Sequence, residues 1–112
     1  MLDAHKVEEL RQDVLARGWR RVIVLGTPEH MAGPSLRRPL AASGVMVLVP
    51  GKEDRATIGR MLDEGVVDEA MLNALLCDGL EHGVDAVVVS DERLARVVEG
   101  FGLLVPVVRV CC

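Results

Sequence analysis

Residues 21–27 read Arg-Val-Ile-Val-Leu-Gly-Thr, a short β-branched apolar run that ends at a glycine. A run of this kind, bounded by turn signals, predicts a strand that is buried on both faces. Three further apolar runs, at 45–49, 84–89 and 103–110, predict strands as well. Pro106 interrupts the last run, and this suits an edge strand because proline lacks a backbone N–H donor. The chain therefore carries four predicted strands.

Helices are predicted between these strands from apolar residues at helical spacing and from capping residues. Asp3, Asp54, Asp68 and Asp91 are the expected N-caps of four of them. The five predicted helices cover 3–17, 34–43, 55–63, 69–82 and about 91–99, whereas 26–31 is expected to be a loop. Strands alternating with helices form right-handed crossovers in a parallel sheet. The predicted fold is a small α/β domain over residues 1–112, with an open four-stranded parallel sheet of flavodoxin-like order 2-1-3-4 and helices on both faces.

Composition excludes several functional classes. The chain has 112 residues, a formal net charge of −4 and only 2% aromatic residues. Nucleic-acid modules rely on aromatic platforms or a basic surface, so no nucleic-acid partner is expected. No apolar run approaches the roughly 18 residues that span a bilayer, and the start of the chain does not resemble a signal peptide. We therefore expect no membrane partner and a cytoplasmic location.

The cysteines and the loops match no familiar cofactor motif. Cys77, Cys111 and Cys112 form no disulfide framework, and the spacing of His and Cys fits no zinc site. Cys77 is expected to be a small buried residue on a helix. The glycines match neither a phosphate-binding P-loop nor a dinucleotide fingerprint. No metal and no cofactor are predicted.

Open parallel sheets hold ligands beyond the carboxyl ends of their strands, where the winding reverses. In the order 2-1-3-4 that point lies between the first and third strands, so the loops at 26–31 and 90–93 should meet there. The last strand ends on the same side. The candidate residues from these segments are Thr27, His30, Met31, Ser90, Asp91, Glu92, Arg93, Cys111 and Cys112.

Several of these residues also have a plain structural explanation. Ser90 or Asp91 suits a helix N-cap, and Glu92 suits a first helical turn near the positive end of the helix dipole. His30 could be an ordinary solvated loop residue. Met31 could form a wall or a lid of the crevice.

An ordered set of short motifs runs through the chain. It comprises Leu25-Gly26-Thr27 followed by Met31, Gly44-Val45 leading to Pro50, Glu64-Gly65-Val66-Val67, Gly83-Val84-Asp85-Ala86-Val87-Val88-Val89, and Val105-Pro106-Val107. In order and spacing the set resembles one lobe of the aspartate/glutamate racemase family over about residues 20–108. The resemblance is to the second of the two lobes of that family. It implies a cofactor-independent reaction on a small carboxylate-bearing molecule.

The resemblance also implies a partner, because in that family two lobes enclose the site and each lobe supplies one cysteine that moves the α-proton. A homodimer or a second lobe-like chain would complete such a site. This sequence departs from the pattern where the chemistry should be. Asp91 stands at the cysteine position, Glu92 at the threonine and Arg93 at the glutamate, and His30 replaces a small hydroxyl residue before Met31.

Three explanations of the departure are open. In the first, Asp91 and His30 carry out acid–base chemistry of a racemase, isomerase or lyase type, and Thr27, Ser90, Glu92 and Arg93 bind the substrate. In the second, a terminal thiol, Cys111 or Cys112, acts as nucleophile beside His30 and Asp91. In the third, the lobe has lost its chemistry and is a binding or assembly domain.

Overall fold

The computed structural model describes residues 3–110. Four parallel strands form one sheet: β1 (Arg21–Leu25), β2 (Met46–Leu48), β3 (Ala86–Val89) and β4 (Val107–Arg109). Their order is β2-β1-β3-β4, which confirms the predicted topology. The two inner strands are almost wholly buried, whereas the two edge strands are half-covered and short. The continuous apolar runs at the centre of the sheet therefore correspond to strands with both faces covered.

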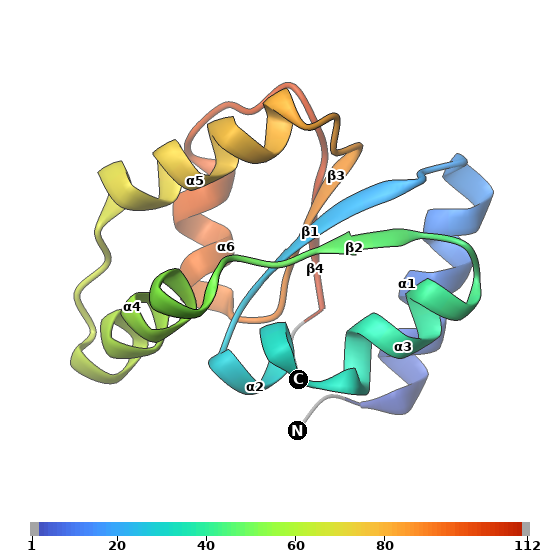
Figure 1. Ribbon diagram of the computed structural model, residues 1–112, viewed down its shortest axis with the longest axis horizontal. Coiled ribbons are helices and arrows are strands. Elements are labelled where there is room, and N and C mark those ends of the chain that lie inside the picture. Colours follow the sequence, from blue (N-terminus) through green and yellow to red (C-terminus); the bar gives the residue numbers. More distant parts are fainter. Residues whose placement is uncertain (1–2, 111–112) are drawn as a thin grey trace.

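Six helices surround the sheet in residues 3–110. They are α1 (Ala4–Arg17), α2 (Pro28–Ala32), α3 (Pro34–Ala42), α4 (Lys52–Glu64), α5 (Glu69–Glu81) and α6 (Glu92–Glu99). Helices α1 and α3 lie on one side of the sheet, and α4, α5 and α6 lie on the other (Figure 1). This distribution follows from right-handed crossovers. The chain passes from β1 to β2 on one side, and then from β2 to β3 on the opposite side of β1, so the helices of these two crossovers cover opposite faces of the sheet.

The core is aliphatic and joins both layers of helices to the sheet. Leu25 and Val89 end the two inner strands, Leu40 comes from one helical layer, and Leu72 and Leu94 come from the other; none of these side chains is exposed. Apolar burial of this kind is the main favourable contribution to folding. The inner strands are thus held firmly, and so are the residues that directly follow them.

Most predicted helix starts are confirmed. Asp3, Asp68 and Asp91 each accept a backbone N–H in the first turn of α1, α5 and α6, respectively. The prediction that Asp54 is the N-cap of α4 is wrong. That cap would start the helix at residue 55, whereas α4 begins three residues earlier, directly after Gly51. Asp54 instead lies inside the first turn, where a carboxylate is stabilised by the helix dipole.

Two further predictions about the loops and cysteines are wrong. Residues 28–32 form the short helix α2, not a loop, and Met31 on it is completely buried in the core instead of lining a crevice. Cys77 is exposed, not buried, because Leu72 and Leu76 define the inward stripe of α5 and Cys77 lies beside that stripe. Within residues 3–110, no helix has the length and apolar character needed to cross a membrane.

Candidate functional site

The inner strands β1 and β3 end level with each other. Leu25 is paired with Val89, and the backbone N–H of Ser90 donates to the carbonyl of Leu25 at 2.9 Å. Gly26 and Ser90 therefore leave the sheet side by side, at the point where the winding of the crossovers reverses. This is the position at which an open parallel sheet offers a ligand site.

Helix α2 places His30 over this point. The Thr27 hydroxyl oxygen caps the helix by accepting the backbone N–H of His30 at 3.3 Å, and Pro28 occupies the first turn, where its missing N–H costs nothing. Met31, with none of its surface exposed, anchors the helix in the core. A threonine, a proline and a buried methionine thus hold in place the short helix that carries His30.

His30 and Ser90 are in direct contact. The distance between Nδ1 of the imidazole and Oγ of the serine is 2.8 Å, which is a hydrogen bond between residues 60 positions apart. Ser90 is only 7% exposed and is the one buried polar residue in the part of the chain that the structure describes. Buried polar groups normally need a partner, and His30 provides it.

Gly26 leaves the space that the serine hydroxyl occupies. A Cβ on residue 26 would lie 1.8 Å from Ser90 Oγ and 3.6 Å from His30 Cβ. No side chain larger than hydrogen therefore fits at this position while the hydrogen bond is in place. The glycine, the serine and the histidine form one packed unit, which we call the Gly26–His30–Ser90 unit.

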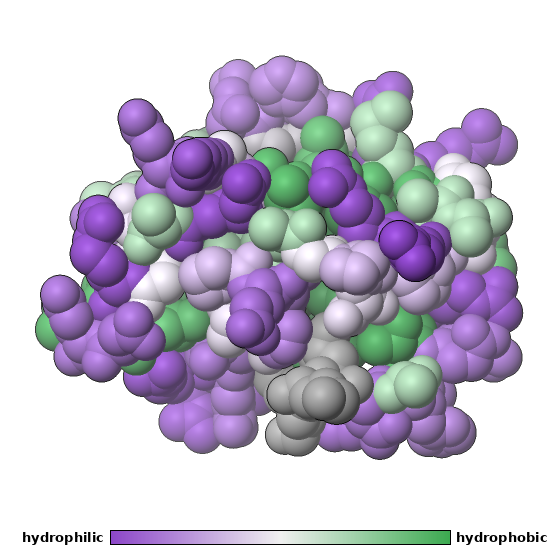
Figure 2. Space-filling model, turned by 60° about the horizontal axis from the view of Figure 1, so that its bottom comes forward, coloured by the Kyte–Doolittle hydropathy of each residue, from purple (hydrophilic) through white to green (hydrophobic). Residues whose placement is uncertain are grey.

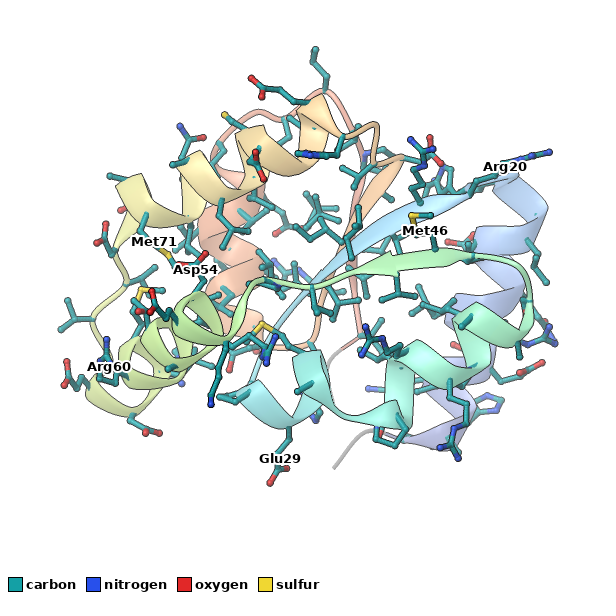
Figure 3. All side chains as sticks on the ribbon, viewed as in Figure 1. Arg20, Glu29, Met46, Asp54, Arg60 and Met71 are labelled. Carbon is teal, nitrogen blue, oxygen red and sulfur yellow. The ribbon has the colours of Figure 1, made fainter. Side chains whose placement is uncertain are left out.

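The environment keeps His30 neutral near pH 7. Burial lowers the pKa of the imidazole below its ordinary value, and the nearby carboxylates of Glu29 and Asp91 raise it in part. The Glu29 side chain points away from the body of the molecule (Figure 3). A neutral imidazole has one nitrogen free to accept a proton, and this is the form that a general base requires.

Asp91 is the N-cap of α6. One carboxylate oxygen, Oδ1, accepts the backbone N–H groups of Arg93 at 2.9 Å and Leu94 at 3.2 Å. The same oxygen lies 3.7 Å from Nε of Arg93. The capping explanation considered for Asp91 is therefore confirmed, although Oδ2 makes none of these contacts.

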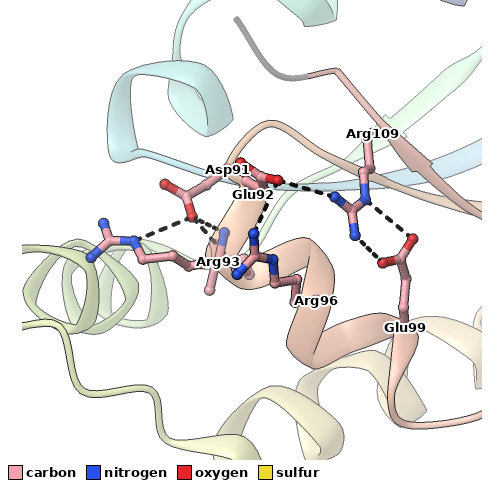
Figure 4. Close-up of polar contacts among 7 residues, drawn as sticks. Asp91, Glu92, Arg93, Arg96, Glu99 and Arg109 are labelled. Carbon is pink, nitrogen blue, oxygen red and sulfur yellow. Dashed lines mark hydrogen bonds and ion pairs between the residues drawn. The ribbon is translucent and has the colours of Figure 1, made fainter.

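Glu92 and Arg93 lie at the surface beside this cap. Glu92 forms ion pairs with Arg96 at 3.3 Å and with Arg109 at 3.6 Å, and Arg109 also pairs with Glu99 (Figure 4). These pairs connect β4 to α6 at the outside of the sheet. The side chain of Arg93 is 53% exposed and lies on the other side of the cap, toward solvent.

The predicted residues thus fall into three groups. His30, Ser90 and Asp91 come together, Thr27 supports them as the cap of α2, and Glu92 and Arg93 flank them at the surface. Cys111 and Cys112 lie outside the described residues. Within 3–110, no cluster of three or more His, Cys, Asp or Glu side chains could hold a metal ion.

The surface at the carboxyl ends of the strands is mixed in character. Figure 2 turns the bottom of Figure 1 toward the viewer and shows polar side chains interspersed with smaller apolar areas. Separate from the Gly26–His30–Ser90 unit, a hollow of about 460 Å³ lies between α1 and β4, lined by Leu10 and Val108 with charged residues around them. The hollow beside the β4 edge is thus distinct from the Gly26–His30–Ser90 unit.

One signal that points to the site was missed in the sequence. The run Thr27-Pro28-Glu29 carries a capping residue, a proline suited to the first turn and an acid in that turn, which together mark a helix start. Helix α2 has only five residues, too few for a hydrophobic period to be visible. The contact between His30 and Ser90 follows from that helix and could not be predicted without it.

Comparison with known proteins supports the fold. No family model matches the chain, and no curated protein matches its sequence. Solved structures do match. An Asp/Glu racemase candidate from Yersinia pestis superimposes with a TM-score of 0.82 at 19% identity, and an aspartate racemase homologue from Pyrococcus horikoshii OT3 with 0.75 at 22%.

Both matches cover 92% of this chain but only 48% of the chain compared. The chain therefore spans about half the length of these structures. At this level of identity the likeness is one of fold, and the fold is that of a single lobe of proteins that resemble aspartate and glutamate racemases.

Proposed function

We propose that this lobe catalyses cofactor-independent proton transfer, of a racemase, isomerase or lyase type, on a small carboxylate-bearing molecule. The observation that carries the proposal is the hydrogen bond between His30 and Ser90, formed where β1 and β3 end. A neutral imidazole held at this position is equipped to remove a proton from a bound molecule.

In this proposal His30 is the base. Its Nδ1 is engaged by Ser90, so Nε2 is the nitrogen that takes or returns the proton. Asp91 is the second acid–base group, acting through the carboxylate oxygen that does not cap α6. A carboxylate and an imidazole in one site can serve as the two proton carriers of an isomerisation.

Arg93 is proposed to bind the substrate carboxylate, since its guanidinium is exposed at the rim and arginine forms charge-assisted, bidentate contacts with carboxylates. Thr27, Ser90 and Glu92 are proposed as further substrate-binding residues, although Thr27 and Ser90 already serve the local structure. No cofactor is included in the proposal. The terminal thiol Cys111 is the alternative catalytic group.

A second subunit is part of the proposal. The chain matches about half the length of the structures it resembles, and the other half would supply a second lobe. We propose that a homodimer, or a second lobe-like chain, covers the site and excludes water. Sedimentation of the protein at increasing concentration tests the homodimer directly: a single species with the mass of one chain would contradict it.

The experiment that tests the reaction is proton exchange in heavy water. The protein is incubated with a panel of amino acids and dicarboxylic acids, and deuterium at Cα is measured by NMR and mass spectrometry. We expect incorporation with at least one compound, lost in His30→Gln. Absence of deuterium across the whole panel would overturn the proposed reaction.

A second candidate function is a binding or assembly domain without catalysis. The observation in its favour is that the polar groups of the site satisfy one another: Ser90 is bonded to His30, and Asp91 is bonded to the backbone of α6. The same panel distinguishes the two functions. A compound that shifts the amide signals of residues 26–31 and 90–93 but never acquires deuterium would identify a binding domain.

A further inference from the structure

We propose that Ser90 is a positioning residue that acts through His30: it holds Nδ1 of the imidazole and leaves Nε2 as the nitrogen available for proton transfer. This inference deepens the proposed function and assigns Ser90 a role other than substrate binding. It rests on the geometry of the Gly26–His30–Ser90 unit.

The first argument is that the contact is specific in direction. Ser90 Oγ lies 2.8 Å from Nδ1, and among residues 3–110 Nε2 has no hydrogen-bond partner. Within the described part of the chain the two ring nitrogens therefore differ, since Nδ1 is hydrogen-bonded and Nε2 is not. In histidine sites, the partner of one nitrogen determines which tautomer is present at the other.

The second argument is that a hydroxyl suits both protonation states of the ring. A serine hydroxyl can donate to the lone pair of Nδ1 or accept from its N–H, because its proton rotates. For Nε2 to take a proton, the neutral ring must carry its hydrogen on Nδ1, so Ser90 Oγ accepts from Nδ1 both before and after the transfer. The hydrogen bond is thus kept, in the same direction, throughout the proton transfer.

The third argument is that the fold reserves the space. Ser90 is 7% exposed, so its hydroxyl is poorly placed to meet a ligand, and Gly26 provides the room without which the hydroxyl could not face His30. The backbone of Ser90 is itself held by Leu25 at 2.9 Å. Both ends of the hydrogen bond are therefore fixed by the sheet and by α2.

Two substitutions break the same contact from opposite sides. Ser90→Ala removes the hydroxyl. Gly26→Ala keeps the serine but adds a Cβ 1.8 Å from the present position of Oγ, so the hydroxyl has to move. Among residues 3–110, the charged groups that act on the pKa of His30 are Glu29 on its own helix and Asp91 at the start of α6, and neither variant changes them. A common effect of the two variants on His30 is therefore an effect of the hydrogen bond.

The test is an NMR titration of His30 in the protein labelled with ¹⁵N-histidine, which requires no substrate. In the wild type we expect one neutral tautomer to dominate, read from the separation of the two ring ¹⁵N shifts. In Ser90→Ala and in Gly26→Ala we expect mixed tautomers and a lower pKa, because a protonated Nδ1 would lack its acceptor. The double variant should resemble Ser90→Ala alone.

Ser90→Thr is the conservative control, because it keeps the hydroxyl and should restore the wild-type tautomer. His5 and His82, whose side chains are exposed, are internal references whose ring ¹⁵N signals should be the same in every variant. If Ser90→Ala leaves the tautomer and the pKa of His30 unchanged while the protein stays folded, the positioning role is wrong. That result would leave the heavy-water test of the reaction untouched, and failure of that test would not alter the titration.

Discussion

Gly59 of α4 lies against the ring of Pro28 at the start of α2, so closely that a Cβ on residue 59 would be 2.8 Å from Pro28 Cγ. The helix that carries His30 is therefore seated on another helix through a position that admits only glycine. Because α2 is too short to be stable alone, its place depends on this contact and on the burial of Met31.

Gly59→Ala should lower the free energy of unfolding. Alanine in a helix interior normally gains about 1 kcal/mol over glycine, but overpacking costs about 1–3 kcal/mol, and the overlap with Pro28 is severe. Gly79→Ala is the matched control, since its Cβ would meet the flexible end of Ile23 at 3.3 Å and Val84 Cγ2 at an ordinary contact distance of 3.9 Å. Urea unfolding of both variants tests this: equal stabilisation by the two alanines would contradict it.

Asp91→Asn should separate chemistry from capping. Asparagine caps helices about as well as aspartate, so we expect little change in stability, whereas Asp91→Ala should cost about 1 kcal/mol. If Asp91 also moves protons, the asparagine variant should lose about 100-fold or more in deuterium exchange. Asp68→Asn and Asp68→Ala, at the N-cap of α5, are controls that should affect stability alone. Full exchange by Asp91→Asn would restrict Asp91 to its structural role.

Protonation of Asp85 in acid should lower the free energy of unfolding. Its carboxylate accepts the backbone N–H groups of Arg20 at 2.7 Å and Arg21 at 3.0 Å, and these hydrogen bonds lower its pKa from the ordinary 3.8. A carboxyl whose pKa is lower in the folded state stabilises fully above its unfolded pKa and loses that contribution as pH falls through the folded one.

The comparison protein is Asp85→Asn, which keeps an oxygen acceptor but does not titrate. The difference in unfolding free energy between wild type and variant should be constant from pH 7 to about 5 and shrink below about 4. Glu8 and Glu99, whose pKa values are also lowered, are present in both proteins and cancel. A difference that is the same at pH 3 and pH 7 would show that the folded pKa of Asp85 is not lowered.

His30 should make the free energy of unfolding depend on pH in a second, higher pH range. Burial lowers its pKa in the folded state below the ordinary 6.5, so the unfolded chain binds more protons between these two values. Stability should therefore be complete above about pH 6.5 and fall as the pH drops toward the folded pKa. Chemical unfolding of the wild type and of His30→Gln at pH 7.5 and 5.5 measures this loss of stability. The wild type should lose more stability than the variant, and an equal loss would contradict the burial argument.

The sheet could be predicted because its signal is local. Runs such as 84–89 are long enough and apolar enough to be identified as buried strands, and the helices between them determine a parallel order. Asp68 was identified as a cap because its helix begins directly after it. The prediction for Asp54 was wrong because two acids, Glu53 and Asp54, occur in the first turn of α4. From sequence alone, an acid in the first turn can be mistaken for the N-cap that precedes the turn.

The site could be predicted only as a neighbourhood. Topology brings the ends of β1 and β3 together, so His30, Ser90 and Asp91 were correctly expected at one edge of the sheet. Which side chains touch depends on α2, on the space at Gly26 and on the direction of each rotamer. The prediction that Cys77 is buried was wrong for a related reason. Cys77 lies one residue outside the apolar stripe of α5 and therefore faces solvent, although cysteine is a hydrophobic residue.

The pairing of β1 with β3 also has a consequence for how the chain folds. The residues that it joins are far apart in sequence, as the 60 positions between His30 and Ser90 illustrate, so the central ladder closes a long loop at an entropic cost. During synthesis β1 must wait for most of the chain to emerge before its inner neighbour exists. We therefore expect the imidazole–serine contact to form only once the central ladder has closed, and the ring ¹⁵N signature of His30 can report that step of folding.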